Sequence, residues 1–354
     1  MSHSTIPPWT VAMPVLGAVA YATLGANPAP WAGALLGVAL IATVLAAVHH
    51  AELLAARVGD PFGAILLALA VTVIEVGLIV SIMLGNKPAP TLVRDTILAV
   101  VMLMLHAIAG ACIVAGALRH REQAFRIQGA HAHLIVLIPM VALTLIIPNY
   151  TVSSPGPFYT ATQLVFVSVV CLALYGAFSF TQTVRHREHF IPPGPAPDGV
   201  RPGARLAAAA SVLLIVALIA VVLLAKSVTP VLQAAASAAG APAASVGVAV
   251  AAIVLLPEAL AALAAARANR LQTSINLALG SAIASIGLTI PAVAVVAVWT
   301  GVPLALGVSQ QDSALLALSF LIALVTYGTG RASLLAGVVH LLLFATWLFL
   351  LFAP

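Results

Sequence analysis

The chain has 354 residues, of which 63% are hydrophobic and only 6% are charged, and its mean hydropathy is +1.17. This composition excludes a water-soluble globular protein, because too few polar side chains remain to cover a surface that faces water. The net charge of +5 does not require a nucleic-acid partner, since Lys and Arg gather in the cytoplasmic loops of membrane proteins. We therefore predict a protein whose main partner is membrane lipid.

The apolar segments are continuous, which predicts helices, because the strands of a membrane barrel would alternate apolar and polar residues. About 20 apolar residues are needed for each helical span. The first span is interrupted by Pro14 and Gly17, and no basic residue precedes it, so we interpret it as a helix and not as a signal peptide. In chain order, eleven spans are expected near residues 10–26, 30–48, 62–84, 92–117, 131–149, 158–181, 206–225, 243–266, 271–299, 314–329 and 332–352.

A polar stretch rich in proline and glycine, residues 185–205, divides the spans into two groups and predicts a flexible linker. The fold class is therefore an all-α membrane protein, with an N-terminal helix in residues 1–28, one five-helix block in 29–184 and a second in 206–354. A block with an odd number of spans that is repeated must enter the membrane upside down the second time. This is the inverted-repeat plan of secondary transporters.

Two glutamates lie in the middle of apolar spans, Glu75 in the second span of the first block and Glu258 in the second span of the second block. A lone carboxylate in a bilayer costs at least about 2.5–3.5 kcal/mol, and such residues usually mark an ion pathway. One alternative is that each glutamate is protonated and hydrogen-bonded within the bundle. Two glutamates at matching positions favour a shared cation site, with both as metal ligands.

The backbone and hydroxyls near each glutamate also point to a site. Pro257 removes one helical hydrogen bond and frees the carbonyl of Ile253 as a cation ligand, although a plain kink explains Pro257 equally well. Thr72 lies on the same helix face as Glu75, but its hydroxyl could instead bond back to its own helix.

The span that follows each glutamate carries further candidates. Ser281, Ser285 and Thr289 recur every four residues and Asn276 precedes them, although a stripe of small residues also serves helix packing. In the first block, His106 lies at mid-depth. It could carry or gate protons, or it could be a neutral side chain bonded to a carbonyl.

Other titratable side chains are assigned ordinary roles. The histidines at 49, 50, 131 and 133 lie near span ends and are expected to be solvated there. Cys112 and Cys171 are expected to be small buried residues outside any disulfide. No zinc-protease HExxH sequence or phosphate-binding Walker loop is present, so we expect no catalytic residues and no cofactor, and an ion gradient as the energy source.

The distribution of basic residues predicts the orientation. With the N-terminus inside, eleven of the fourteen Lys and Arg residues fall in inside loops, whereas Lys87, Arg94 and Lys226 fall outside. An odd number of spans then places the C-terminus outside.

The segment AVHHAELLAARVGDPFGAILLALAVTVIEVGLI, from Ala47 to Ile79, resembles the bacterial Cha-type calcium/sodium:proton antiporters, in the calcium:cation antiporter superfamily with the CAX calcium/proton exchangers. PTLVRDTI, LLPEALAAL, SINLALGSAIASIGLTIPAV and TGRASLLAGVVHL match in order and spacing. The resemblance implies two inverted five-helix repeats and places Glu75 and Glu258 as the glutamates that bind the cation and exchange protons. It also places Ser281 and Ser285 facing the site, with His106 near a polar position of the family.

The sequence departs from the CAX pattern GNxxE, because Glu75 follows VTVI and Glu258 follows VLLP, and the linker carries only Glu188 and Asp198 as acids. The resemblance implies a multi-pass protein of the bacterial inner membrane. The predicted function is export of Na⁺ or Ca²⁺, with K⁺ as a third candidate, in exchange for protons. The alternative is a passive cation channel, which would use the same carboxylates without proton coupling. A non-transporting scaffold leaves both carboxylates unexplained, and an intramembrane enzyme has no motif in its favour.

Overall fold

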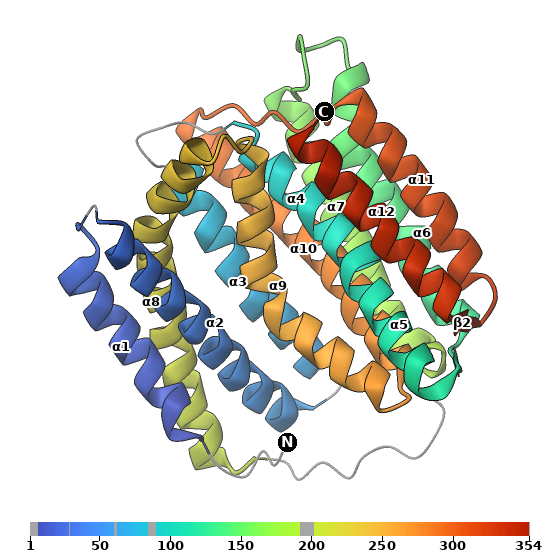
Figure 1. Ribbon diagram of the computed structural model, residues 1–354, viewed down its shortest axis with the longest axis horizontal. Helices are drawn as coiled ribbons and strands as arrows, with labels where there is room; N and C mark the ends of the chain where they lie inside the picture. The colour runs from blue at the N-terminus through green and yellow to red at the C-terminus, as the bar shows by residue number, and fades with distance from the viewer. Residues whose placement is uncertain (1–5, 28, 60–61, 84–89, 192–201, 354) are drawn as a thin grey trace. The chain divides into compact units, whose positions relative to one another are not determined.

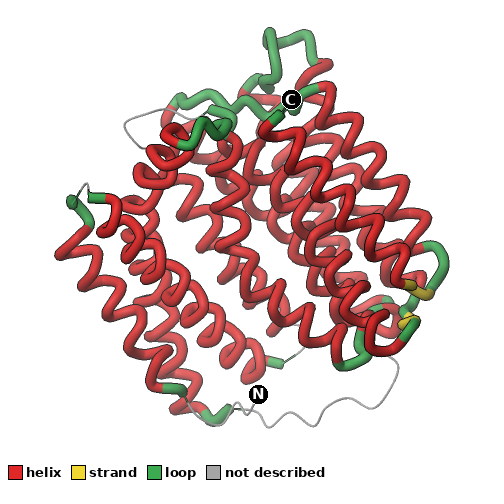
Figure 2. Tube along the Cα trace, in the orientation of Figure 1, coloured by secondary structure: helices red, strands yellow, loops and turns green. Residues whose placement is uncertain are grey.

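The computed structural model describes residues 6–27, 29–59, 62–83, 90–191 and 202–353. Asp60, Lys87 and Asp198 lie outside these ranges, as do residues 192–201 of the predicted linker. Within the described residues the chain is helical almost throughout, with two short strands that lie side by side (Figure 2). The prediction of an all-α membrane protein is confirmed.

Eleven helical spans are present in the described part of the chain, when α4 and α5 are counted as one helix joined through a π-helical turn. Nine of them are long and apolar enough to cross a membrane, and two shorter apolar helices, Pro8–Leu24 and Leu69–Val80, complete the set. The elements are α1 (Pro8–Leu24), α2 (Pro30–Val58), α3 (Phe62–Met83), α4 (Leu92–Met102), η1 (Leu103–Ile108), α5 (Ala109–His120), β1 (Glu122–Ala124), α6 (Ile127–Val141), η2 (Ala142–Ile146), η3 (Ile147–Tyr150), α7 (Ala161–Phe180), η4 (Thr181–Arg185), η5 (Arg187–His189), α8 (Ala204–Ala238), α9 (Ala244–Arg267), α10 (Leu271–Thr300), α11 (Gln310–Tyr327), β2 (Arg331–Ser333) and α12 (Leu334–Phe352).

The chain forms two compact units, and each takes residues from both halves of the sequence. The first comprises residues 1–89 and 195–246. In it α2 packs against α1, α3 and α8, and α8 also contacts α1 and α3 (Figure 1). Glycines allow these close crossings: a Cβ added at Gly17 would lie 2.7 Å from Thr43 Oγ1, and one at Gly33 would collide with Val231.

The second unit comprises residues 90–194 and 247–354. Its central helix is α10, which packs against α6, α7 and the continuous helix of α4, η1 and α5, while α12 packs against η1 and α5. At one end, β1 pairs antiparallel with β2 and ties the turn before α6 to the turn before α12. At the other end, residues 305–308 are fixed by main-chain hydrogen bonds to Pro90, Pro157 and Leu145.

Two helices are longer than the sequence predicts. Helix α2 continues ten residues beyond the expected end at 48, and α8 continues thirteen beyond 225. With 35 residues, α8 is about 52 Å long, well above the roughly 30 Å of a bilayer core. Lys226, assigned by sequence to an outside loop, is instead an exposed residue of α8.

Candidate ion-binding site

Glu75 lies in the middle of α3, in the first unit, and only 2% of its surface is exposed. Thr72, one turn earlier, is also buried, whereas Leu69 and Val73 are exposed. The helix therefore directs Glu75 and Thr72 away from its exposed face. Gly77 brings this part of α3 close to α8, because an added Cβ would lie 2.7 Å from Val222 Cγ2.

Glu258 lies in the middle of α9, half-buried, and directly follows Pro257 inside the helix. Proline cannot donate the hydrogen bond that the carbonyl four residues earlier would otherwise accept, so the backbone at Ile253 is freed. Within the second unit the helix is held near both ends. Gly247 packs against the backbone of Asp95, and Ser274 Oγ donates to the carbonyl of Ala262 at 2.7 Å.

Helix α10 carries the predicted hydroxyls. Ser285 and Thr289 are buried and Ser281 is half-buried. Packing also uses this helix, since a Cβ at Gly287 would lie 2.6 Å from Tyr175 Cβ on α7. Within the described residues, the Thr289 hydroxyl has no hydrogen-bond partner. The helix thus combines glycines that permit close packing with buried hydroxyls.

Asn276 has a local structural role. Its side-chain amide donates to the carbonyl of Phe190 at 2.6 Å, and its oxygen accepts from Gln272 Nε2 at 2.9 Å. Ser285 is nine residues further along α10, which is about 14 Å along the axis. Asn276 therefore anchors the segment after α7, and the structure does not bring it to the position of Ser285.

His106 lies on the π-helical turn η1, fully buried. Its Nδ1 is 2.8 Å from Nδ1 of His340 on α12, and His340 Nε2 is 3.1 Å from Thr326 Oγ1 on α11. The partner is thus a second imidazole, and three helices contribute to one polar chain inside the second unit. π-helical turns often mark functional positions, because they widen the helix and shift side chains out of register.

His340 was not among the predicted site residues. The pairing is set by a close crossing of α5 and α12, where a Cβ at Gly110 would lie 3.0 Å from His340 Cβ, and one at Gly337 would lie 2.9 Å from Val114 N. Gly337 and His340 both belong to the segment TGRASLLAGVVHL. An imidazole in the middle of an otherwise apolar span was the feature of the sequence that could have identified His340.

Two of the expected solvated histidines are buried, so that expectation is wrong for them. His50 Nε2 is 3.1 Å from the carbonyl of Thr10, which shows that α1 covers this end of α2. His133 packs between Phe178 and Phe190, with its Nδ1 2.7 Å from the carbonyl of Gly129.

Asp95 and a groove between α7 and α10 are two further features of the second unit. Asp95 is buried in the first turn of α4, where it pairs with Arg94 at 2.8 Å and accepts from Thr91 at 2.9 Å. A groove of about 720 Å³ between α7 and α10 is lined almost entirely by apolar side chains, and its hydroxyl, Ser168, bonds to its own helix. Neither feature offers a free ligand to a cation.

Comparison with known proteins identifies the family. The model of the sodium/calcium exchanger protein family matches residues 29–184 and 209–353, most of the chain. The chain belongs to the sodium/calcium exchanger family. Members of this family are membrane transporters, so the protein is a transporter of the antiporter type and not an enzyme.

Several relatives of this exchanger are known. The putative ionic transporter y4hA of Sinorhizobium fredii is 45% identical over 99% of this chain and 97% of its own length. The sodium-potassium/proton antiporter ChaA of Escherichia coli is 32% identical over 90% of this chain and 88% of its own length. These matches confirm the resemblance to Cha-type antiporters.

Solved structures match the fold of this exchanger at lower identity. Native YfkE has a TM-score of 0.75 and 18% identity and covers 98% of each chain. The H⁺/Ca²⁺ exchanger CAX has a TM-score of 0.65 and 14% identity, covering 96% of this chain and 89% of its own. The fold is therefore that of the cation-exchanger transporters.

Proposed function

We propose that the protein is a secondary antiporter that exports Na⁺ or Ca²⁺, with K⁺ as a further candidate, in exchange for protons. The observation that carries the proposal is a carboxylate in the middle of an apolar helix in each compact unit, Glu75 on α3 and Glu258 on α9. In this proposal the two carboxylates converge on one site at the centre of the membrane.

The chemistry of exchange follows from two carboxylates in a site of low dielectric. Burial favours the neutral form of a carboxyl group, so each glutamate holds a proton when no cation is present. A cation that arrives from the cytoplasm displaces the protons, because the same oxygens cannot bind both. Exposure of the site first to one side and then to the other makes the exchange obligatory.

The donor set supports a hard cation. Carboxylates and the hydroxyls of Thr72, Ser281 and Ser285 supply only oxygen, which suits Na⁺, K⁺ and Ca²⁺. Among the relatives, ChaA is named a sodium-potassium/proton antiporter and YfkE a Ca²⁺/H⁺ antiporter. Their names share proton coupling and differ in the cation, so Na⁺, K⁺ and Ca²⁺ all remain candidates for exchange with protons.

The polar chain of His106, His340 and Thr326 supports a second element of the proposal. Its three members lie in the second unit and are buried. A hydrogen-bonded imidazole pair can pass a proton from one ring to the other, because each ring has one nitrogen that donates and one that accepts. We assign it to proton movement or gating and not to the cation, which prefers oxygen ligands.

The test is exchange by the full chain in everted membrane vesicles, followed with a pH-sensitive dye as Na⁺, K⁺ or Ca²⁺ is added. Glu75→Gln and Glu258→Gln each remove a carboxylate at nearly constant volume, and we expect both to abolish cation-dependent proton movement while the protein still inserts. Glu122→Gln is the control, because Glu122 is exposed in β1 and its ion-pair partner Arg331 is exposed as well.

Two results would overturn the proposal. Proton-coupled exchange retained in either glutamine variant would remove that carboxylate from the mechanism. A cation current that ignores an imposed pH gradient in the unaltered protein would indicate the passive channel.

A further inference from the structure

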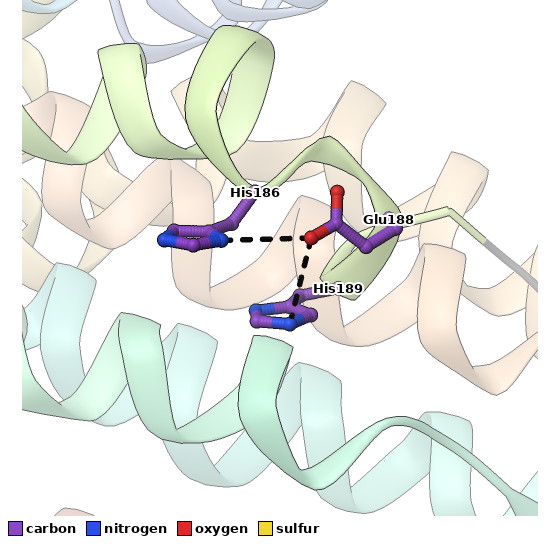
Figure 3. Close-up of side chains that lie close together, drawn as sticks. All are labelled: His186, Glu188 and His189. Atoms are coloured by element: carbon purple, nitrogen blue, oxygen red, sulfur yellow. Dashed lines mark ion pairs between the residues drawn. The ribbon is translucent and has the colours of Figure 1, made fainter.

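Three potential metal ligands gather where α7 ends. His186, Glu188 and His189 lie at the junction of η4 and η5, beyond the apolar span of α7. Glu188 Oε1 is 3.5 Å from His186 Nδ1 and 3.7 Å from His189 Nε2 (Figure 3). Each of the three side chains offers one ligand atom, and within the described residues these atoms all lie within 4.8 Å of one another.

We propose that His186, Glu188 and His189 bind one divalent transition-metal ion of the Zn²⁺ class, at a site separate from that of the transported cation. Two imidazole nitrogens and one carboxylate oxygen form a ligand set that suits Zn²⁺ and its neighbours and leaves a position for water. Na⁺, K⁺ and Ca²⁺ prefer ligand sets made of oxygen, so the transported ion is a poor occupant.

The spacing of the ligand atoms is close to what such an ion needs. With bonds of about 2.0–2.1 Å, a tetrahedral ion holds its ligand atoms about 3.4 Å apart. The two nitrogen–oxygen distances nearly meet this value. The rings are parallel, with centroids 5.1 Å apart and an angle of 3°, so their lone pairs lie in separate planes. One ring must turn on binding, and there is room, since 46% of His186 and 33% of His189 are exposed.

The backbone that presents these ligands is held by independent contacts. The amide of His189 donates to the carbonyl of His186 at 3.0 Å. Gly129 on α6 allows the His189 carbonyl to approach, because a Cβ there would collide with it. Phe190 is buried against Phe178 and His133. A fixed backbone lowers the ordering cost of metal binding.

The Glu188 carboxylate lies near both imidazoles, with Oε1 within 3.7 Å of a ring nitrogen of each. Glu188 is 63% exposed, which leaves a metal ion access from solvent. A bound ion would fasten the beginning of the linker between the two sequence blocks to the end of α7.

The experiment measures metal binding directly in the purified full chain, in detergent, with any affinity tag removed and the protein first stripped by a chelator. Co²⁺ is the probe, because its visible absorption reports nitrogen and oxygen ligands in a tetrahedral or five-coordinate site, and Zn²⁺ is then added to displace it. We expect one Co²⁺ per chain. The pair H186A/H189A and the single variant E188Q should each weaken binding at least about tenfold, the range in which lost supporting groups alter metal affinity.

The matched control is His120→Gln, a histidine outside the cluster whose Nε2 lies 3.1 Å from the carbonyl of Arg267. It should bind Co²⁺ as the unaltered protein does. Equal binding by H186A/H189A and the unaltered chain, or no Co²⁺ bound by the unaltered chain, would overturn the proposal. The outcome is independent of transport, because Glu75→Gln protein should keep the site whether or not it exchanges cations.

Discussion

At the scale of single residues, the buried imidazole pair of the second unit requires matched protonation of its two rings. His106 and His340 are 234 positions apart in the chain, yet their Nδ1 atoms lie 2.8 Å from each other. One Nδ1 must donate a hydrogen bond and the other must accept it, so one proton lies between the two rings. A second added proton would place two positive charges side by side in an apolar interior, which is strongly unfavourable.

His340→Phe tests this pairing. The change leaves Nδ1 of His106 buried without its partner, and we expect the free energy of unfolding to fall by about 1–3 kcal/mol. The measurement is thermal unfolding of the purified protein in detergent. Adding His106→Phe should cost less than the sum of the two single changes, because residues in direct contact are energetically coupled. Strict additivity of the two changes would contradict the hydrogen bond.

At the scale of elements, the sequence was sufficient to find every span but not every boundary. Continuous apolar runs predicted eleven spans, and the described chain has eleven. The ends of α2 and α8 were missed for a physical reason. Beyond residue 48 the chain becomes more polar but still contains the good helix formers Ala, Leu and Glu, and beyond residue 225 it contains Ala, Leu and Gln, so each helix continues after the apolar run ends.

The candidate site was only partly predictable for a related reason. An acidic residue inside an apolar helix is conspicuous in the sequence, so Glu75 and Glu258 could be proposed from the sequence alone, and their shared role stays a prediction. The pairing of His106 with His340, and the attachment of Asn276 to the carbonyl of Phe190, depend on which helices cross. Neither contact is encoded in local spacing.

Helix crossing itself is open to test at Gly337. Gly337→Ala adds a Cβ that would lie 2.8 Å from Val114 Cγ2 and 2.9 Å from Val114 N, so α12 must move away from α5. We expect a loss of about 1–3 kcal/mol in the free energy of unfolding, and a weaker His106–His340 contact.

Gly176→Ala in α7 is the matched control, because an added Cβ there meets nothing within 4 Å. Gly176→Ala should raise the free energy of unfolding by about 0.5–1 kcal/mol, because alanine stabilises a helix interior more than glycine does. A Gly337→Ala protein that is as stable as the Gly176→Ala protein would contradict the close crossing of α5 and α12.

At the scale of the whole molecule, the two compact units cut across the two sequence blocks. The first unit takes α1, α2 and α3 from the beginning of the chain and α8 from the second block, and the second unit takes the other helices. The correspondence between blocks is imperfect, because α3 falls in the first unit whereas most of α9 falls in the second. The inverted-repeat relation between the blocks therefore stays a prediction of the sequence and of the family resemblance.

The orientation of the whole chain is the last prediction, and it rests on the excess of Lys and Arg in alternate loops. With the N-terminus in the cytoplasm, the turn before α6 faces inside and the segment before α7 faces outside.

Glu122→Cys and Ser153→Cys place a thiol in each of these two segments, and both positions are exposed. The native Cys112 and Cys171 are buried, so the background of labelling should be low. A membrane-impermeant thiol reagent should label S153C in spheroplasts and E122C in everted vesicles. The reverse pattern would invert the topology. The Lys and Arg residues that the charge rule assigns to the cytoplasm would then face the outside, and the distribution of basic residues would not account for the orientation of this chain.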